Sequence, residues 1–560
     1  MKLEAWSELL DKEYGHRYPE LGVQLLRGIT HGVPIEFEGD LSVSRHGENH
    51  KSALDNIDEV RRLIAAGCES GKFAGPFPSP PMEPFSSSPL GGVVKTSETG
   101  VTKVRLVHDL SSPFGGNSIN SNTKFAPLYL ESIDAATSAI RRFGAGCLLV
   151  KLDVEAAYKQ IPIDPADWNK VGFTIDGQFY FDRTLPFGLK SSCRLWDMYA
   201  SALHFFFSRQ LGIECVIHYV DDFLFVMKGP PQGAPQGAAE AKLAAALELC
   251  SRLGLPMAAK KTEGPITRLT FLGIEIDTVA MCARLSDERL AQLQSSLASW
   301  GSRTHATLTE LESLTGVLNF AAKVVRPGRA FLRRIIARFT ALRAKRVSKR
   351  SLCPIGASCA ADIRWWQQHV RTWNGVSIML EQEWTDASKL HMWTDACLMG
   401  YGAVYENEWL NGRWPDSVRA ESVRAKRESM PYLELYALVL AAKTWGAHWA
   451  GRKIIFHCDC QPVVQALQTW SSAREGTQHL IRTLATTAAF FDFDFRVEHI
   501  AGLQNVSADA LSRFDMSTFR EQNPAADERM CEHSMLPPLP PQQAAAVPDP
   551  PRGAPSSRRR

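Results

Sequence analysis

The stretch Val216-Ile217-His218-Tyr219-Val220-Asp221-Asp222-Phe223-Leu224-Phe225-Val226 places two adjacent acids between two apolar runs. Runs rich in β-branched and aromatic residues are typical of strands, so the stretch predicts a β-hairpin with both carboxylates at its tip. Two ionised carboxylates about 4 Å apart repel each other by about 4 kcal/mol at an effective dielectric constant near 20. A divalent metal ion is the partner that such a pair favours, and a surface turn that merely carries Asp-Asp is the alternative.

The composition is that of a folded protein with several domains. The chain has 560 residues, 45% hydrophobic and 22% charged, with a formal net charge of +3. This length favours two to four domains, and the small net charge means that affinity for nucleic acid must come from local clusters. Because no apolar run reaches the length of a membrane span and the N-terminus lacks a signal peptide, we expect an intracellular protein, cytoplasmic or nuclear, that is not secreted and contacts no membrane.

The 12 cysteines form neither a CxxC pair nor a Cys/His knuckle, which argues against a disulfide framework and a structural zinc site. Their densest group is His457-Cys458-Asp459-Cys460. On a strand, alternate residues point to opposite faces, so Asp459 should point away from both cysteines. We therefore expect no zinc site there.

A second apolar run, Cys147 to Val154, predicts a strand that carries an acid, Asp153, at its C-terminal end. Sheet proteins place functional sites at such ends, so Asp153 is the candidate third carboxylate. Capping of the helical turn that follows is the alternative role. Further along, Leu185 to Ser192 contain a Pro-Phe-Gly turn that opens a long apolar helix through Phe206.

The remaining first half shows weaker patterns. Residues 1–72 have mixed helical periodicity and no chemical motif, and the proline-rich residues 73–92 predict an extended, non-helical connector. Val93 to Leu110 alternate and predict a hairpin with basic residues on one face. Ala238 to Leu253 predict a helix, and Leu269 to Ile276 predict a strand.

A strongly basic segment follows. Ala321 to Arg350 contain eleven Lys and Arg residues and no acid. Apolar residues at helical spacing predict one helix with a single buried stripe and a cationic remainder: Leu332, Ile335, Ile336, Phe339 and Leu342. A charge run is usually a solvated face, but the lack of any acid makes binding to a nucleic-acid backbone the preferred interpretation.

A second α/β pattern begins near Leu390 and repeatedly places an acid at the end of a strand or on a helix. The predicted elements are strands at His391 to Asp395, Gly400 to Tyr405, Lys453 to Cys458 and Asp492 to Ile500, and helices at Met430 to Trp449 and Val506 to Phe514. Residues beyond about 516 are rich in Pro, Ala and Gln and end in three arginines, so we expect a disordered, basic tail.

Asp153, the Tyr-Val-Asp-Asp hairpin, the Pro-Phe-Gly turn and the basic hairpin together resemble reverse transcriptases, and the second half resembles ribonuclease H. The similarity spans roughly residues 90–515. It implies an α+β and α/β multidomain fold, with a right-hand polymerase of fingers, palm and thumb followed by a ribonuclease H-like α/β domain. Fusion of the two activities is expected because a polymerase that copies RNA leaves an RNA/DNA hybrid whose RNA strand must be removed.

The resemblance implies six parts. They are an N-terminal region of unknown role (1–72), fingers and palm (73–285), a thumb-like basic helical region (286–350), a connection (351–388), a ribonuclease H-like domain (389–515) and a disordered Pro-rich tail (516–560).

Carried over position by position, the resemblance assigns the polymerase site. Asp153 and Asp221 would hold two Mg²⁺ ions, with Asp222 supporting the site. Lys95 and Arg105 match the finger residues that bind the incoming triphosphate.

Three further positions of the polymerase half carry implied roles. Tyr158 matches the bulky residue that excludes a 2′-hydroxyl. Lys261 matches a lysine that protonates pyrophosphate, with its neighbour Lys260 as the alternative. Phe187 stands where some retroviral enzymes have Gln, a departure shared with many retrotransposon enzymes.

In the second half, four acids match the carboxylates that bind two Mg²⁺ ions in ribonuclease H: Asp395, Glu434, Asp459 and Asp509. Mn²⁺ is the expected substitute metal. His499, ten residues before the last acid, would relay a proton to the leaving group or help to release the product.

We therefore expect an RNA-directed and DNA-directed DNA polymerase with ribonuclease H activity that copies retrotransposon RNA by two-metal phosphoryl transfer. Its partners would be an RNA template, a DNA primer, an RNA/DNA hybrid and dNTPs. The stretches Val107 to Asn120 and Lys151 to Pro162 look most like DIRS-like elements of the tyrosine-recombinase group, whose recombinase or integrase would be a separate chain. The alternatives are an inactive or domesticated nucleic-acid-binding protein and an RNA-dependent RNA polymerase, which Tyr158 and the second half disfavour.

Overall fold

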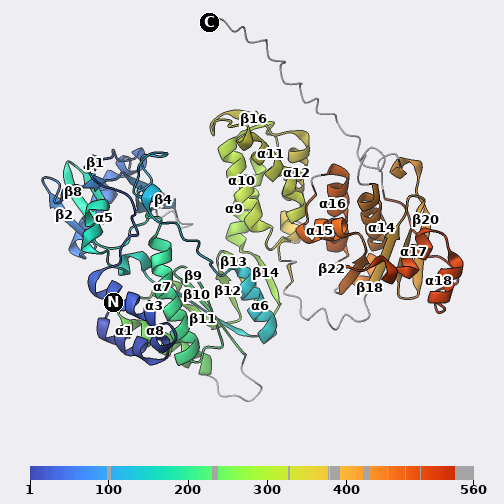
Figure 1. Ribbon diagram of the computed structural model, residues 1–560, viewed down its shortest axis with the longest axis horizontal. Coiled ribbons are helices and arrows are strands. Elements are labelled where there is room, and N and C mark those ends of the chain that lie inside the picture. Colours follow the sequence, from blue (N-terminus) through green and yellow to red (C-terminus); the bar gives the residue numbers. More distant parts are fainter. Residues whose placement is uncertain are drawn as a thin grey trace, which may run out of the picture. The chain divides into compact units, whose positions relative to one another are not determined.

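The computed structural model describes residues 1–96, 102–229, 237–325, 328–375, 377–378, 391–419, 429–450, 452–472, 474–491 and 493–536. The chain divides into two compact units (Figure 1). The first is Met1–Ser286 with Ile378–Glu381, and the second is Asp287–Ser377 with Gln382–Arg560.

The first unit is built on an antiparallel sheet in the order β11-β6-β10-β9. Its strands are β6 (Leu148–Asp153), β9 (Cys215–Tyr219), β10 (Asp222–Met227) and β11 (Glu263–Ile266). The predicted hairpin is confirmed, since β9 and β10 pair with Asp222 opposite Tyr219 and only Val220 and Asp221 lie between them. On the other side of β10, Asp153 lies opposite Asp222. The register of the sheet thus brings the acids of distant segments together.

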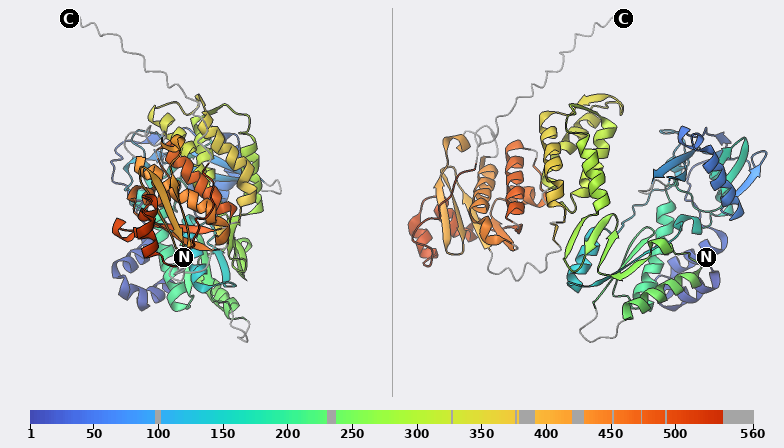
Figure 2. Two further views of the ribbon diagram at one scale, coloured as in Figure 1. Left: turned by 90° about the vertical axis from the view of Figure 1, so that its right-hand side faces the viewer. Right: turned by 180° about the vertical axis from the view of Figure 1, so that it is seen from behind.

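The N-terminal helices complete the core of this sheet. Helices α1 (Leu3–Leu9) and α3 (Pro19–His31) share one hydrophobic cluster with α7 (Ser192–Phe205) and α8 (Ala238–Leu253). The fully buried Trp6 donates from Nε1 to the carbonyl of Leu253 at 3.2 Å. Figures 1 and 2 show α1 beside α8. Residues at the start of the chain, which carry no chemical motif, therefore have a packing role.

A second sheet of this unit has the order β1-β3-β7-β8-β2. Its strands are β1 (Arg45–His46), β2 (Phe73–Phe77), β3 (Ser86–Ser87), β7 (Gly172–Ile175) and β8 (Gln178–Asp182). The predicted extended, non-helical conformation of residues 73–92 is confirmed, but this segment is more than a connector, because β2 and β3 belong to this sheet. Pro76 is tolerated because β2 is an edge strand with a register shift between Ala74 and Phe77, and the Phe73 ring packs 5.3 Å from the Phe173 ring.

Two further hairpins lie in the first unit. The predicted basic hairpin is confirmed as β4 (Leu90–Thr96) and β5 (Thr102–His108). The strand predicted at Leu269 to Ile276 is instead a tight hairpin of β12 (Arg268–Phe271) and β13 (Ile274–Asp277), continued by β14 (Cys282–Leu285). The chain reverses because Leu272 and Gly273 take φ values of 49° and 78°. The remaining α-helices of this unit are α2 (Gly15–Arg17), α4 (Lys51–Leu54), α5 (Ile57–Glu69) and α6 (Ile133–Phe143).

The second unit begins with a helical part. It contains α9 (Asp287–Ala298), α10 (Leu308–Ala321), α11 (Arg333–Ala344) and α12 (Ala357–Trp373), with the short hairpin β15 (His305–Thr307) and β16 (Leu352–Pro354). The single basic helix predicted within Ala321 to Arg350 is wrong in extent, since α11 covers only part of it. Two of its arginines are also engaged internally, because Arg334 pairs with Glu475 at 3.3 Å and Arg338 donates to the Pro354 carbonyl at 2.9 Å.

The rest of the second unit is a mixed sheet in the order β20-β19-β18-β21-β22. β18 (His391–Ala396), β19 (Gly400–Tyr405) and β20 (Glu408–Arg413) are antiparallel, whereas β18, β21 (Lys453–Cys458) and β22 (Asp494–His499) are parallel. The helices are α14 (Ser429–Trp445), α15 (Gln461–Thr469), α16 (Glu475–Phe490), α17 (Val506–Ser512) and α18 (Met516–Gln522).

The predicted disorder beyond residue 516 is wrong for residues 516–536. Phe519 on α18 is fully buried, with its ring 5.4 Å from that of Trp409. The Arg520 guanidinium lies 5.4 Å from the same Trp409 ring, and the Asp527 amide donates to the Asn407 carbonyl at 2.9 Å. An apolar anchor therefore fixes a segment whose composition alone favours disorder. Residues 537–560 lie outside the described part of the chain.

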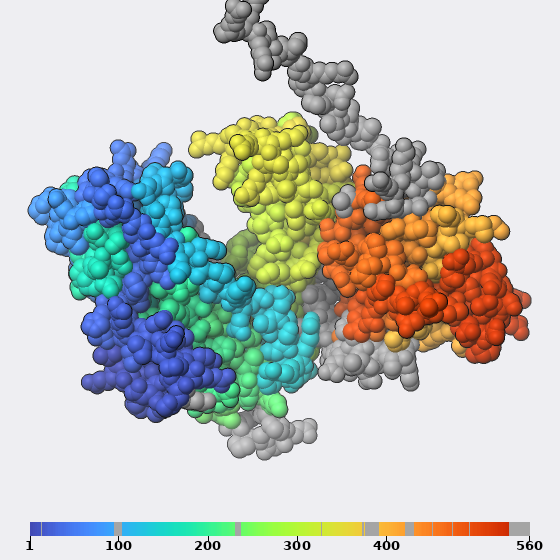
Figure 3. Space-filling view, in the orientation of Figure 1, coloured from blue at the N-terminus to red at the C-terminus, as the bar shows by residue number. Residues whose placement is uncertain are grey.

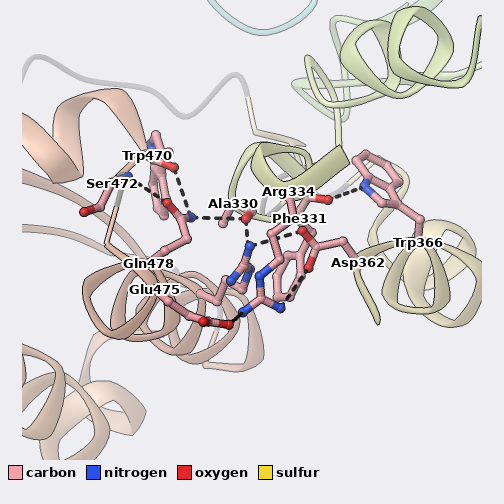
Figure 4. A network of polar contacts seen from close by, with 10 residues as sticks. Ala330, Phe331, Arg334, Asp362, Trp366, Trp470, Ser472, Glu475 and Gln478 are labelled. Atoms are coloured by element: carbon pink, nitrogen blue, oxygen red, sulfur yellow. Dashed lines mark hydrogen bonds and ion pairs between the residues drawn. The ribbon is translucent and has the colours of Figure 1, made fainter. Parts of the chain in front are cut away.

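A buried polar network joins the two parts of the second unit (Figure 4). Arg482 on α16 donates to the Ala330 carbonyl at 3.2 Å and to Asp362 on α12 at 3.1 Å. Arg482 and Asp362 are 6% and 2% exposed, so this pair is shielded from solvent. Gln478 also donates to the Ala330 carbonyl, at 3.3 Å. In Figure 3 the yellow and orange surfaces of this unit lie next to each other along part of their boundary.

Candidate active sites

Three carboxylates meet at the tip of the β9–β10 hairpin. The Val154 amide, just after β6, donates to the Asp221 carbonyl at 3.1 Å, which fixes Asp153 beside the turn. Burial and the charges of Asp221 and Asp153 raise the pKa of Asp222 to about 6. Burial also raises the pKa of Asp221, and Asp153 adds to this effect. The geometry predicted from the sequence is present, although the catalytic roles stay predictions.

One lysine reaches this cluster. Lys261 Nζ lies 2.6 Å from Asp153 Oδ2, while its side chain is 60% exposed. Burial alone would lower the pKa of Lys261, but the hydrogen bond to Asp153 and the charges of Asp221 and Asp222 raise it overall. Of the two neighbouring lysines considered for this role, the structure thus places Lys261 against the acids.

An aromatic and cationic platform flanks the acids. The rings of Tyr158 and Phe187 lie 5.1 Å apart, and the Arg105 guanidinium lies 5.1 Å from the Phe187 ring. Arg105 is exposed on β5 and close enough to Asp221 to lower the pKa of that carboxyl against the effect of burial. The backbone of Lys95 lies in β4 opposite Lys103, but its side chain falls outside the described part.

Two supports of this platform were missed in the sequence. Gly188 has φ of +115°, and a Cβ there would lie 1.9 Å from the His108 carbonyl oxygen, so only glycine lets the Phe187 turn meet β5. The second support is the buried Asp182. Its Oδ2 lies 3.0 Å from His108 Nδ1, and its carboxylate also pairs with Lys159, the residue after Tyr158. The Pro-Phe-Gly signal predicted the turn but not its partner strand.

Four carboxylates converge at one edge of the mixed sheet. Asp395 lies on β18, Glu434 on α14, Asp459 directly after β21 and Asp509 on α17. Burial, with the nearby charges of Asp459 and Asp509, raises the pKa of Asp395 to about 7, although Ser512 Oγ donates to Asp395 Oδ2 at 2.5 Å. Burial and the charges of Asp395 and Asp459 raise the pKa of Glu434 well above its ordinary value.

Cys458 lies within this cluster, so the expectation that Asp459 points away from both neighbouring cysteines is wrong for Cys458. One ligand atom each of Glu434, Cys458 and Asp459 lie within 4.8 Å of one another. Asp459 does not point away from Cys458, because β21 ends at Cys458 and strand alternation no longer applies beyond it. Burial raises the pKa of the Cys458 thiol well above its ordinary value, so the thiol stays protonated and the carboxylates are the better ligands.

His499 and Asn505 complete this edge. His499 ends β22, and its Nε2 lies 3.1 Å from the Asp459 carbonyl oxygen. The buried Asn505, which sequence reasoning missed, donates to the Thr394 carbonyl at 2.9 Å and so ties the segment before α17 to β18. Asp509, the last of the four acids, pairs with Arg513 Nε at 2.7 Å.

Both clusters suit divalent cations. Burial and neighbouring carboxylates raise the pKa values of Asp221 and Asp222 in the first cluster, and of Asp395, Glu434 and Asp459 in the second. A bound cation relieves this condition. In the second cluster, Glu434 Oε2 is buried and has no hydrogen-bond partner among the residues that the structure describes. All-oxygen donor sets of this kind are those that Mg²⁺ prefers.

Comparison with known proteins concerns the segment that contains the first of these clusters. Residues 104–276 match the family described as "Reverse transcriptase (RNA-dependent DNA polymerase)", a stretch that contains Asp153, Asp221 and Asp222. Residues 104–276 form a reverse transcriptase domain. About 205 residues of the chain are also 27% identical to Protein P of duck hepatitis B virus (strain Germany/DHBV-3), covering 36% of this chain and 24% of Protein P. Protein P of the strain from China is 25% identical over 204 residues, with the same coverage.

Among solved structures, a foamy viral protease-reverse transcriptase in complex with double-stranded DNA is similar, with a TM-score of 0.48 and 14% identity. That similarity covers 89% of this chain and 81% of the other. The foamy viral protease-reverse transcriptase in complex with an RNA/DNA hybrid gives a TM-score of 0.46 and 14% identity, with 88% and 62% covered. The mixed sheet lies beyond the reverse transcriptase domain. None of the described helices has the length and apolarity needed to cross a bilayer.

Proposed function

We propose that the chain is an RNA-directed and DNA-directed DNA polymerase with ribonuclease H activity, of the kind that retrotransposons encode. The observation that supports it most strongly is the pair of carboxylate clusters, one on the sheet of the reverse transcriptase domain and one on the mixed sheet of the second unit. A DIRS-like origin, with a recombinase on a separate chain, is part of the proposal and is based on the Val107 to Asn120 and Lys151 to Pro162 stretches.

In the polymerase reaction, Asp153 and Asp221 hold Mg²⁺, and Asp222 supports them. Bound Mg²⁺ supplies the positive charge that activates the primer hydroxyl and neutralises the triphosphate. Arg105, exposed and near Asp221, contacts the triphosphate together with Lys95. Tyr158 packs against the deoxyribose and leaves no space for a 2′-hydroxyl.

Lys261 has a separate role in this reaction. Its Nζ is held by Asp153 at 2.6 Å, and its raised pKa keeps it protonated at neutral pH. From this position the Lys261 ammonium would donate a proton to the leaving pyrophosphate.

In the ribonuclease H reaction, Asp395, Glu434, Asp459 and Asp509 hold Mg²⁺ at the edge of the mixed sheet. His499, held by the Asp459 carbonyl, either relays a proton to the leaving group or helps to release the product.

Nucleic acid binds in part through exposed cations of the second unit. After the internal contacts of Arg334 and Arg338 are set aside, the exposed basic residues at and beyond the end of α11 are Arg343, Lys345, Arg346, Lys349 and Arg350. Cations on such a surface neutralise phosphates and make binding depend on salt.

Two substitutions separate the two activities. Asp221→Asn should lower primer extension on poly(rA) by a factor of at least about 10³, because roughly 4 kcal/mol of transition-state stabilisation is lost. Asp459→Asn should spare extension and stop cleavage of the RNA strand in a hybrid. Asp40→Asn, which changes an exposed acid of the first unit, is the matched control.

The outcomes distinguish the proposal from its alternatives. Extension that survives Asp221→Asn would remove the polymerase assignment. Hybrid binding in gel shifts, without turnover by the wild-type chain, would support a domesticated binding protein. Preference for NTPs over dNTPs would support an RNA polymerase.

A further inference from the structure

Three side chains of the first unit converge at a place that the proposed reactions do not use. Glu131, His204 and His218 each offer one ligand atom, and these atoms lie within 4.8 Å of one another. Glu131 precedes α6, His204 lies in the last turn of α7 and His218 lies on β9. Separate elements of the fold therefore supply the three groups.

The hydrogen bonds around His218 define where its lone pair points. His218 Nε2 lies 3.3 Å from Asp197 Oδ1, and a carboxylate accepts hydrogen bonds, so Nε2 carries the proton. His218 Nδ1 is then an acceptor, 3.0 Å from His204 Nδ1. Glu131 Oε2, which already accepts from the His218 amide at 2.7 Å, lies 3.9 Å from the same Nδ1.

The third candidate ligand, His204, presents a ring nitrogen to the same place. Its Nδ1 lies 3.0 Å from His218 Nδ1, and it would bind the metal in the tautomer that carries the proton on Nε2. Zinc bonds of about 2.0–2.1 Å in tetrahedral geometry place neighbouring ligand atoms roughly 3.3 Å apart. The two distances at His218 Nδ1, 3.0 Å and 3.9 Å, lie on either side of that value.

We propose that Glu131, His204 and His218 bind Zn²⁺ or a similar first-row transition-metal ion, with Asp197 as the positioning residue that orients His218. Two imidazoles and one carboxylate are a donor set that zinc accepts and Mg²⁺ does not favour. The Glu131 side chain is 38% exposed, which leaves room for water as a fourth ligand. A carboxylate on the far nitrogen of a ligating histidine is the usual support of such sites.

The site would strengthen the polymerase hairpin. It joins α7 to β9, the strand that leads into the Val220-Asp221 turn. The same helix already holds this turn, because Trp196 Nε1 donates to the Val220 carbonyl at 2.8 Å. The inference does not depend on polymerase activity, since metal binding can be measured directly.

The test uses the full chain, freed of metal with a chelator and kept in excess Mg²⁺ to saturate the carboxylate clusters. Zinc affinity is measured by competition with a metal indicator, and Co²⁺ absorption reports tetrahedral coordination. We expect wild-type protein to bind one tight ion. Asp197→Asn should weaken binding by about 10–100-fold, and His204→Gln or Glu131→Gln should weaken it by more than about 100-fold.

Two controls test the location. His16→Gln changes an exposed histidine of the same unit and should leave zinc affinity unchanged. Cys458→Ser removes the thiol of the other cluster and should also leave it unchanged. Thermal unfolding in chelator verifies that each variant folds. If His204→Gln does not fold, Glu131→Gln still tests the site, because the Glu131 side chain is partly exposed and its replacement should not prevent folding.

The proposal is overturned if wild-type protein binds no tight zinc ion. It is also overturned if folded Glu131→Gln and His204→Gln bind zinc as tightly as wild type, or if only Cys458→Ser loses the ion.

Discussion

Tyr158 is the residue on which sugar discrimination is expected to depend. Its ring is fixed against Phe187 at 5.1 Å. Tyr158→Ala should raise ribonucleotide incorporation relative to deoxyribonucleotide incorporation by about 10–100-fold, in line with the 1–3 kcal/mol that a pocket contributes per group. Single-nucleotide extension with dNTPs and NTPs measures this ratio. Tyr158→Phe keeps the ring and should behave as wild type, so an equal change in both variants would contradict a steric role.

Asp395 should make stability depend on pH when metal is removed. The pKa of its carboxyl is about 7, against an ordinary value of 3.8, so between these values the folded protein keeps a proton that the unfolded chain has released. The contribution of Asp395 to stability therefore falls as pH rises from about 4 to about 7. In EDTA, Asp395→Asn should gain stability relative to wild type over this range, by on the order of 1–4 kcal/mol.

Urea unfolding at pH 5 and pH 7.5 measures this difference. Saturating Mg²⁺ should stabilise wild type by roughly 2.7 kcal/mol at 100 times its dissociation constant, and the variant by less. A variant that gains nothing between the two pH values would contradict the raised pKa.

Residues with a chemical pattern were predictable, whereas residues defined by their neighbours were not. Asp221 and Asp222 stand out because acids interrupt apolar strands. Glycine is required at position 188 because the His108 carbonyl lies against it, and no feature of the neighbouring sequence predicts that contact. The end of the strand at Cys458 was predicted correctly, but strand alternation does not extend to Asp459 beyond it, so the expectation that Asp459 points away from Cys458 was wrong.

Among the elements, α18 should contribute measurably to the stability of the second unit. Phe519→Ala removes a fully buried ring and should cost about 3–5 kcal/mol. Denaturant unfolding followed by tryptophan fluorescence suits this test, because Trp409 contacts Phe519. Phe490→Ala, which truncates a ring that is 76% exposed, should change stability by less than about 0.5 kcal/mol. Equal effects of the two substitutions would mean that α18 does not pack as described.

Strands and helices with strong periodicity were predictable, but the turns and proline-rich segments between them were harder to predict. Ala238 to Leu253 were predicted as a helix, and α8 has those bounds. Leu269 to Ile276 were predicted as one strand because the apolar alternation continues through the reversal at Leu272 and Gly273. The prolines of residues 73–92 indicated extended chain correctly, but not that part of it pairs at the edge of a sheet. Pairing of this kind depends on segments about a hundred residues away, such as β8.

At the scale of the whole molecule, the Arg482–Asp362 pair should couple the helical and sheet parts of the second unit. Asp362→Ala leaves Arg482 buried without its carboxylate, which typically costs 3–5 kcal/mol. Replacing both residues, as in Asp362→Leu with Arg482→Met, should recover much of this loss because no buried charge remains unpaired. Asp416→Ala, at an exposed acid of the same unit, is the control.

Thermal unfolding of the four proteins measures this coupling. A double variant as unstable as Asp362→Ala would indicate that packing, rather than charge, is what the pair provides. The sequence could not predict the pair, because its members lie 120 positions apart on helices without a shared motif.

The N-terminal helices have a practical consequence for protein production. The Trp6 ring lies 6.0 Å from the Phe206 ring and 5.7 Å from the Tyr199 ring, and both of these residues are fully buried. An expression clone trimmed to the part that resembles a polymerase would uncover these rings and invite aggregation. Shortened versions for crystallisation or assay should therefore keep Met1 and the helices that follow it.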